Sequence, residues 1–68
     1  LILNAEGYQT KALGMNSHAE GLQSAASGFN SHAEGLKTEA AGNNSHAEGF
    51  QTKANKDNSA CRRAYYCG

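Results

Sequence analysis

A six-residue motif that recurs every 14 residues limits the possible fold more than any other feature of the chain. Asn-Ser-His-Ala-Glu-Gly occupies residues 16–21, 30–35 and 44–49, and the shorter Asn-Ala-Glu-Gly stands in the same register at 4–7. The segments 8–12, 22–26, 36–40 and 50–54 also repeat, each reading large apolar, polar, hydroxyl, variable, alanine. A fixed period of this kind indicates one structural unit stacked on the next.

The unit is too short for a pair of helices, and its two glycine positions exclude one long helix. Gly21 and Gly28, with their equivalents, break the chain about every seven residues, while residues between them alternate in character as strands do. We interpret each repeat as two short strands with turns at these glycines, so that one repeat forms one coil. The predicted fold is all-β: a parallel β-roll, or β-solenoid, of about four 14-residue coils over residues 1–57. Residues 58–68, with two cysteines, are predicted to form a C-terminal cap or loop.

Alternation along each strand also predicts which side chains face inward. The interior is predicted to be lined by Ser17 and Ala19 from a first strand, by Thr38 and Ala40 from a second strand, and by their copies in the other repeats. The histidines and glutamates alternate with the inward residues of the first strand and are therefore predicted to face outward. Burial of such small side chains contributes little free energy to offset the roughly 1 to 2 kcal/mol of backbone entropy lost per ordered residue. We therefore expect the large apolar residues at the turn corners to pack between chains. These interface candidates are Tyr8, Leu22, Phe29, Leu36 and Phe50.

The repeat, Asn-Ser-x-Ala-x-Gly followed by x-x-Thr/Ser-x-Ala-x-Gly, resembles the head repeats of trimeric autotransporter adhesins. The wording Ser-His-Ala-Glu-Gly is similar to repeat arrays in tail-fibre and neck-appendage proteins of phages and prophages of Gram-positive bacteria. The resemblance covers residues 2–57 and implies a left-handed roll, assembled as a homotrimer whose first strands line a common axis. The axis candidates are then His18, Glu20, His32, Glu34, His46 and Glu48. The adhesin heads usually have apolar residues at these positions, so the chain resembles the phage-type repeat more than the adhesin repeat.

These features predict a structural spacer and trimerisation segment of a phage or prophage tail fibre or neck appendage. It would lie on the virion surface and support host attachment, with adjoining modules contacting a host receptor or matrix. One alternative is the head segment of a bacterial trimeric adhesin that binds host matrix at the cell surface. The other is an ice-binding or metal-binding solenoid, although the threonines are expected to face inward.

Catalysis, nucleic acid and membrane are not indicated. His-x-Glu lacks the Pro-Cys-x-x-Cys of zinc deaminases, and neither His-Glu-x-x-His nor Gly-x-Ser-x-Gly occurs, so we predict no enzyme. Six basic residues balance six acidic ones, and no apolar run approaches the roughly 20 residues that cross a bilayer. Imidazoles around an axis can hold Zn²⁺ or Ni²⁺, but hydrogen bonds from histidine to glutamate of a neighbouring chain are favoured. We therefore assign no metal and no cofactor.

The two cysteines, Cys61 and Cys67, are separated by five residues, which matches no common zinc spacing. A short disulfide loop between them is the favoured interpretation outside a reducing compartment. Free thiols and a bridge between chains are the alternatives.

Overall fold

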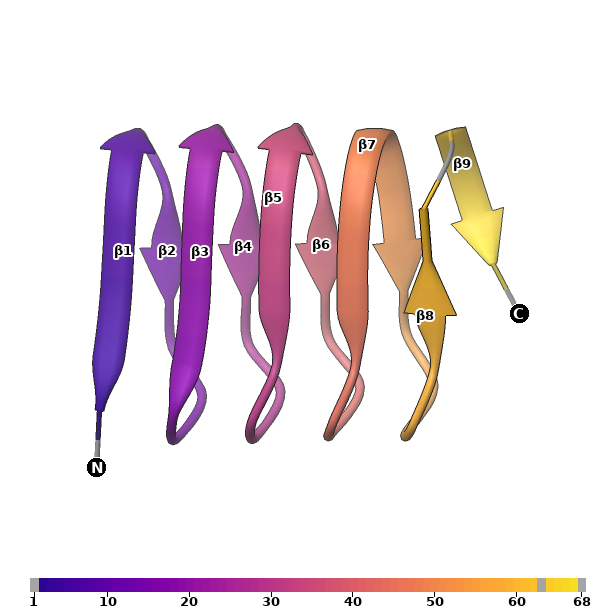
Figure 1. Cartoon of the computed structure of the whole chain (residues 1–68), viewed down its shortest axis with the longest axis horizontal. Helices are drawn as coiled ribbons and strands as arrows, with labels where there is room; N and C mark the ends of the chain where they lie inside the picture. The colour runs from indigo at the N-terminus through magenta and orange to yellow at the C-terminus, as the bar shows by residue number, and fades with distance from the viewer. Residues whose placement is uncertain (1, 63, 68) are drawn as a thin grey trace.

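The computed structural model describes residues 2–62 and 64–67, and it folds these residues into strands and turns without a helix (Figure 1). The strands are β1 (Leu3–Tyr8), β2 (Lys11–Ala12), β3 (Ser17–Leu22), β4 (Ala25–Ala26), β5 (His32–Leu36), β6 (Glu39–Ala40), β7 (His46–Ala54), β8 (Ala60–Cys61) and β9 (Ala64–Cys67). The described residues therefore contain no helix that could span a membrane.

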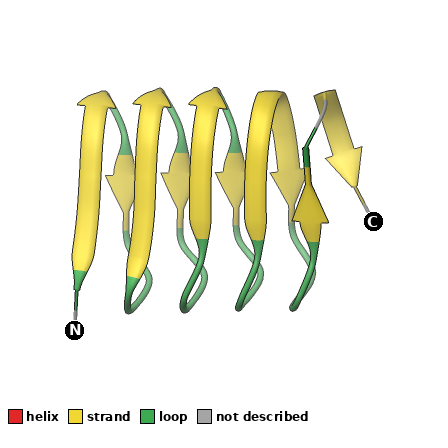
Figure 2. Cartoon of the chain, in the orientation of Figure 1, coloured by secondary structure: helices red, strands yellow, loops and turns green. Residues whose placement is uncertain are grey.

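The strands form two layers joined by turns at two corners (Figure 2). β1, β3, β5 and the first part of β7 pair in parallel in one layer, and β2, β4, β6 and the end of β7 pair in parallel in the other. β7 continues round the corner and so belongs to both layers. Partners in adjacent coils are 14 residues apart, as in Ala19 with Ala33 and Ala33 with Ala47. The predicted fold, a β-solenoid of stacked 14-residue coils, is confirmed.

The interior between the layers contains only small side chains, as the alternation predicted. Six alanines have no exposed surface, and six serine or threonine residues are at most 3% exposed. These are Ala19, Ala26, Ala33, Ala40, Ala47 and Ala54, with Ser17, Ser24, Ser31, Thr38, Ser45 and Thr52. The two layers can approach closely because nothing larger separates them, and the molecule measures 27 × 24 × 11 Å along its principal axes.

The glycines expected at the turns have the properties predicted for them, since Gly21 has a φ of 109° and Gly28 lies at a bend, but other residues also turn the corners. Gly21 lies inside β3, and the left-handed backbone at the two corners of that coil falls on Gln23 (φ 57°) and Asn30 (φ 56°). The equivalent residues in the other coils are also left-handed: Gln9, Asn16, Lys37, Asn44, Gln51 and Asn58. Asparagine adopts this conformation readily, whereas glutamine and lysine do so at a cost.

Hydrogen bonds between side chains of successive coils accompany this backbone conformation. The Asn30 side-chain amide donates to Oδ1 of Asn44 at 3.1 Å, and the Gln23 amide donates to Oε1 of Gln9 at 2.8 Å. Because asparagine recurs every 14 positions at one corner, a row of amide hydrogen bonds joins Asn16, Asn30, Asn44 and Asn58. At the other corner Lys37 interrupts the row, and the amide bond joins Gln23 to Gln9.

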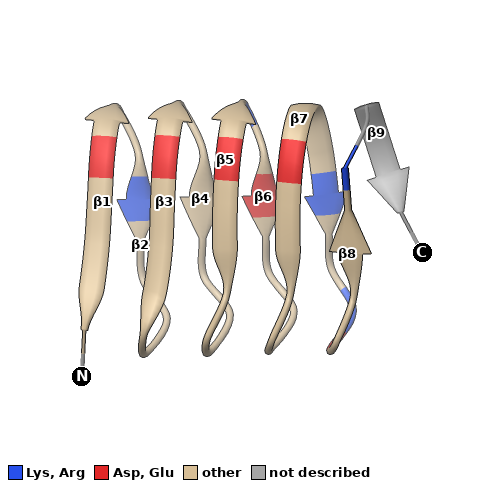
Figure 3. Cartoon of the chain, viewed as in Figure 1, with Lys and Arg blue, Asp and Glu red and all other residues tan. Residues whose placement is uncertain are grey.

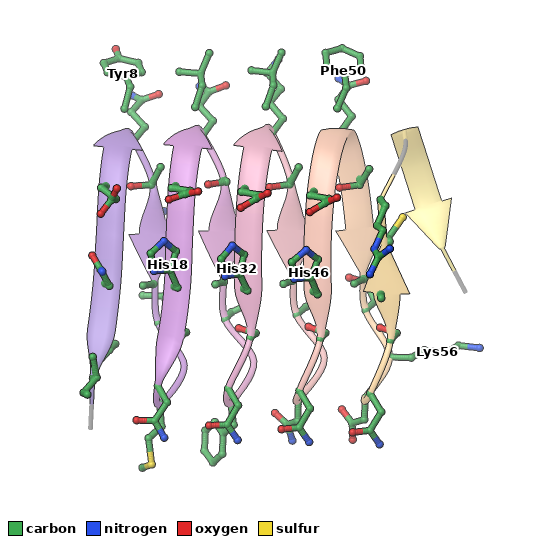
Figure 4. All side chains as sticks on the ribbon, in the orientation of Figure 1. Tyr8, His18, His32, His46, Phe50 and Lys56 are labelled. Carbon is green, nitrogen blue, oxygen red and sulfur yellow. The ribbon has the colours of Figure 1, made fainter. Side chains whose placement is uncertain are left out.

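Glycine is required where one coil touches the next. A Cβ on Gly28 would lie 2.0 Å from the carbonyl oxygen of Gly42, although the φ of Gly28 is not in the left-handed region. Position 56 is the equivalent site in the fourth coil and holds lysine. No described coil covers that position, and the Lys56 side chain is exposed and extends past the array (Figure 4). At Gly28 the contact with the next coil, and not its own φ, therefore requires glycine, whereas Gly21 has both a positive φ of 109° and a carbonyl oxygen of the next coil 2.2 Å from the position of a Cβ.

The C-terminal segment, expected as a cap or loop, adds β8 and β9 to the end of the sheet. β8 pairs with β7 in the 14-residue register, which sets Cys61 against Ala47 in the inner column. β9 pairs with the rest of β7 after a shift of one residue, and its Cys67 backbone is in register with Ala54. Cys61 is buried and takes part in a disulfide. The side chain of Cys67, its partner expected from the sequence, lies outside the described side chains.

Candidate functional site

Three histidines and three glutamates lie together on the outer face of the β3–β5–β7 layer. Residues two apart on a strand point to the same side, so each imidazole meets the carboxylate two residues on. The distance from Nε2 to Oε1 is 3.0 Å for His18 and Glu20 and 2.9 Å for the other two pairs, His32 with Glu34 and His46 with Glu48. All six axis candidates are thus brought to one face, and their side chains are between 31% and 39% exposed.

The three imidazole rings form a stack. The ring centroids of His18 and His32 are 4.8 Å apart and those of His32 and His46 are 4.9 Å apart, with planes inclined by 7° and 13° (Figure 4). These separations reproduce the spacing of paired strands, since the histidines are in register across the layer. The column continues with Asn4 in β1 and Ala60 in β8, so the stack ends after three rings.

A second column, of carboxylates, runs beside the histidines along β1, β3, β5 and β7 (Figure 3). It lines a shallow groove together with the glycines that follow each glutamate and with Arg62: the lining is Glu6, Gly7, Glu20, Gly21, Glu34, Gly35, Glu48, Gly49 and Arg62. The hydrogen bond from His18 lowers the pKa of Glu20, and that from His46 lowers the pKa of Glu48, against a smaller opposing effect of desolvation. Both carboxylates are therefore charged at neutral pH and accept the Nε2–H of their histidine.

The large apolar residues expected at the interface lie on the outside of the single chain. Tyr8, Leu22, Leu36 and Phe50 are in register with one another and form a row at one corner, here called the apolar ladder. Tyr8 is 64% exposed and Phe50 46%, and both point away from the coils (Figure 4). Leu22 is also exposed, at 40%, and Leu36 is partly buried.

The fifth interface candidate, Phe29, lies at the opposite corner and is 54% exposed. Met15 precedes it in its column, whereas Asn43 and Asp57 follow. Asn43 Oδ1 accepts the backbone N–H of Phe29 at 3.0 Å, and Asp57 Oδ1 accepts that of Asn43 at 2.9 Å. This corner is thus apolar in the early coils and polar in the late ones, while the apolar ladder spans four coils.

Sequence reasoning missed that each histidine bonds to the glutamate of its own strand. Hydrogen bonds to a neighbouring chain were favoured instead, and the structure of one chain does not test those. The signal was present in the sequence, because residues at i and i+2 of an exposed strand lie close enough for an imidazole to reach a carboxylate. The amide rows of the corners gave the same kind of signal, as Asn and Gln repeat at fixed positions.

Comparisons of the chain with protein-family models, curated proteins and solved structures found no match.

Proposed function

We propose that the chain is a spacer and trimerisation segment of a phage or prophage tail fibre or neck appendage, where it supports attachment to a host surface. The observation that carries this proposal is the inverted placement of apolar residues. The interior holds alanine and small hydroxyl residues, while Leu22, Phe50 and the other members of the apolar ladder stay in contact with water. Contiguous exposed apolar surface marks an interaction site.

The shape of the apolar ladder suits another copy of the same chain. Its members are in register, so they form a straight row parallel to the direction in which the coils stack. A second copy placed side by side in the same direction covers the row over its whole length. Cyclic symmetry with the axis along the array repeats this contact for every chain. The number three is taken from the resemblance of the repeat to trimeric fibre proteins.

The His and Glu columns support a position near the trimer axis for the layer formed by β1, β3, β5 and the first part of β7. Buried charges are tolerated when they are paired and hydrogen-bonded, and Glu20, Glu34 and Glu48 each have a histidine of their own strand at 2.9 to 3.0 Å. Neighbouring chains can therefore cover these three pairs without leaving a partner unpaired, whereas Glu6 in the first coil has asparagine at the histidine position. This accounts for polar residues at positions that are usually apolar in the adhesin heads.

A solenoid also meets the mechanical requirement of a spacer. Each coil contacts only its neighbours, so added coils lengthen the structure by about 4.8 Å each and leave the cross-section unchanged. Contact with a host receptor or matrix is assigned to adjoining modules, and the location to the virion surface. Ice binding is not favoured, because Thr38 and Thr52 are buried and their hydroxyl groups do not reach the surface.

The mass of the folded chain in solution tests this proposal. One chain has a mass of 7.1 kDa, so sedimentation equilibrium should give three times that value, about 21 kDa. Leu36→Asp in the apolar ladder should dissociate the assembly. The matched control is Leu13→Asp, because Leu13 is 65% exposed but lies outside the ladder, and it should leave the mass unchanged. A stable, folded monomer of the unmodified chain would refute the proposal.

A further inference from the structure

Three potential metal ligands from two neighbouring strands converge on the outer face. The atoms that His18, Glu20 and His32 can offer all lie within 4.8 Å of one another. Two of the ligands come from β3 and one from β5, whose histidines pair directly in the parallel register. In the single chain all three residues are about one-third exposed, so an ion can reach them from solvent before neighbouring chains cover this face.

The donor set is one that zinc uses in proteins. Zn²⁺ binds imidazole nitrogen at about 2.0–2.1 Å and carboxylate oxygen at about 2.0–2.2 Å, and two histidines with one glutamate occur as a three-ligand set that leaves a position for water. Tetrahedral coordination at these lengths sets ligand atoms about 3.3 Å apart. His18 Nε2 and Glu20 Oε1 are 3.0 Å apart, so this pair is already close to the required separation.

Charge along the face favours this end of the columns over the other. In β1, Asn4 occupies the histidine position, so Glu6 adds a carboxylate beside Glu20 with no histidine two residues before it. At the far end Arg62 lines the groove and acts electrostatically on Glu48. A cation is therefore attracted more strongly to the cluster on β3 and β5 than to the equivalent residues near Arg62.

We propose that His18, Glu20 and His32 form a binding site for one divalent transition-metal ion, with Zn²⁺ as the best fit. From the sequence alone, hydrogen bonding of the histidines to glutamates is favoured over metal binding. The structure adds the observation that three potential metal ligands from two coils converge. The ion takes the place of the proton between His18 Nε2 and Glu20 Oε1. The neutral imidazole then carries its single proton on Nδ1 instead of Nε2, and the lone pair of Nε2 binds the ion. The two rings, which are nearly parallel, turn toward the ion, because a nitrogen lone pair lies in the plane of its ring.

Titration of the whole chain with Zn²⁺ alone, after treatment with a chelator, tests the site. Calorimetry should show one ion bound per chain, and Co²⁺ in its place should give the visible absorption of a tetrahedral complex. His32→Ala should weaken binding at least tenfold, since loss of even an outer partner of a zinc ligand costs about 10- to 100-fold. His46→Ala is the matched control from the same column and should retain the affinity of the unmodified chain. Equal losses in the two variants, or no saturable binding, would overturn the proposal.

A second measurement avoids substitutions altogether. Nitrogen-15 NMR of the imidazoles should show that Zn²⁺ moves the Nε2 resonances of His18 and His32 and leaves that of His46 in place. Uniform changes at all three histidines would show diffuse binding along the column and would also overturn the proposal. All three ligands belong to one chain, so the site needs no residue of a neighbouring chain.

Discussion

Replacing Gly28 with alanine isolates the contact between one coil and the next. Gly28 has no left-handed φ, so the added methyl group causes no backbone strain of its own. It would lie 2.0 Å from the carbonyl oxygen of Gly42, where a Cβ contact under 3.0 Å is not tolerated. The obstacle is backbone, which cannot swing aside as the end of a side chain can. The two coils must therefore separate by about 1 Å at this corner.

The hydrogen bonds beside Gly28 set the size of the effect. The backbone N–H groups of Ser27 and Gly28 both donate to the carbonyl of Ala40, at 3.0 and 3.2 Å. A displacement of about 1 Å takes both beyond bonding distance. With roughly 0.5–1.5 kcal/mol for each bond, and packing lost around them, Gly28→Ala should lower the free energy of unfolding by about 2–4 kcal/mol.

Lys56→Ala provides the control, because position 56 is the same site in the fourth coil and no described coil lies against it. This variant should change stability by less than about 0.5 kcal/mol. Urea unfolding followed by circular dichroism, at one protein concentration for all variants, measures both. If Gly28→Ala has the same free energy of unfolding as the unmodified chain, the stacked coils can accommodate a methyl group at this corner, and the explanation for glycine there is wrong.

Three further predictions concern the apolar ladder, the dependence of stability on acidic pH, and the disulfide. Leu36→Ala should lower the free energy of unfolding of the assembly by roughly 2–5 kcal/mol if the apolar ladder is buried between chains; a chemical denaturation curve within about 0.5 kcal/mol of the unmodified one would place Leu36 in water. Because the His46 hydrogen bond lowers the pKa of Glu48 from 4.5, it contributes stability that is present above that value and lost as pH falls through the folded pKa. Glu48→Gln should therefore flatten the acid limb of the melting-temperature profile, and an unaltered limb would contradict this. Cys61→Ala should cost about 2–4 kcal/mol in the oxidised protein, since alanine fits the inner column and only the disulfide is lost; reductant should destabilise the unmodified chain but not the variant.

The interior and the outer face were predictable from sequence because both follow from alternation. Burial of one side of a strand imposes a period of two, so the positions of Ala19 and Thr38 follow once the strands are assigned. His18 and Glu20 share the opposite side for the same reason. The 14-residue period then fixes which residues meet across coils, and the register of the layers needs no further information.

The corners were less predictable, because their conformation depends on contacts outside the turn. Single-residue preferences assign positive φ to glycine, and Gly21 has it, but Gln23 also adopts left-handed backbone and bonds to a residue of the preceding coil. Gly28 is likewise explained by a carbonyl 14 residues away. The one-residue shift that sets Cys67 against Ala54 has no signature in the motif, since the repeat has ended by then.

The glycine contacts between coils predict how the length of the repeat array can change through duplication or loss of gene segments. The unit from residue 29 to 42 ends in glycine, so it accepts another coil after itself, and its first strand fits after any unit that also ends in glycine. Duplication or loss of this 14-codon segment should therefore yield chains that differ in length but fold equally well. The unit that ends in Lys56 has no such freedom, because a full coil stacked on it would meet the lysine side chain. Length variation is thus expected within the array and excluded after its last unit.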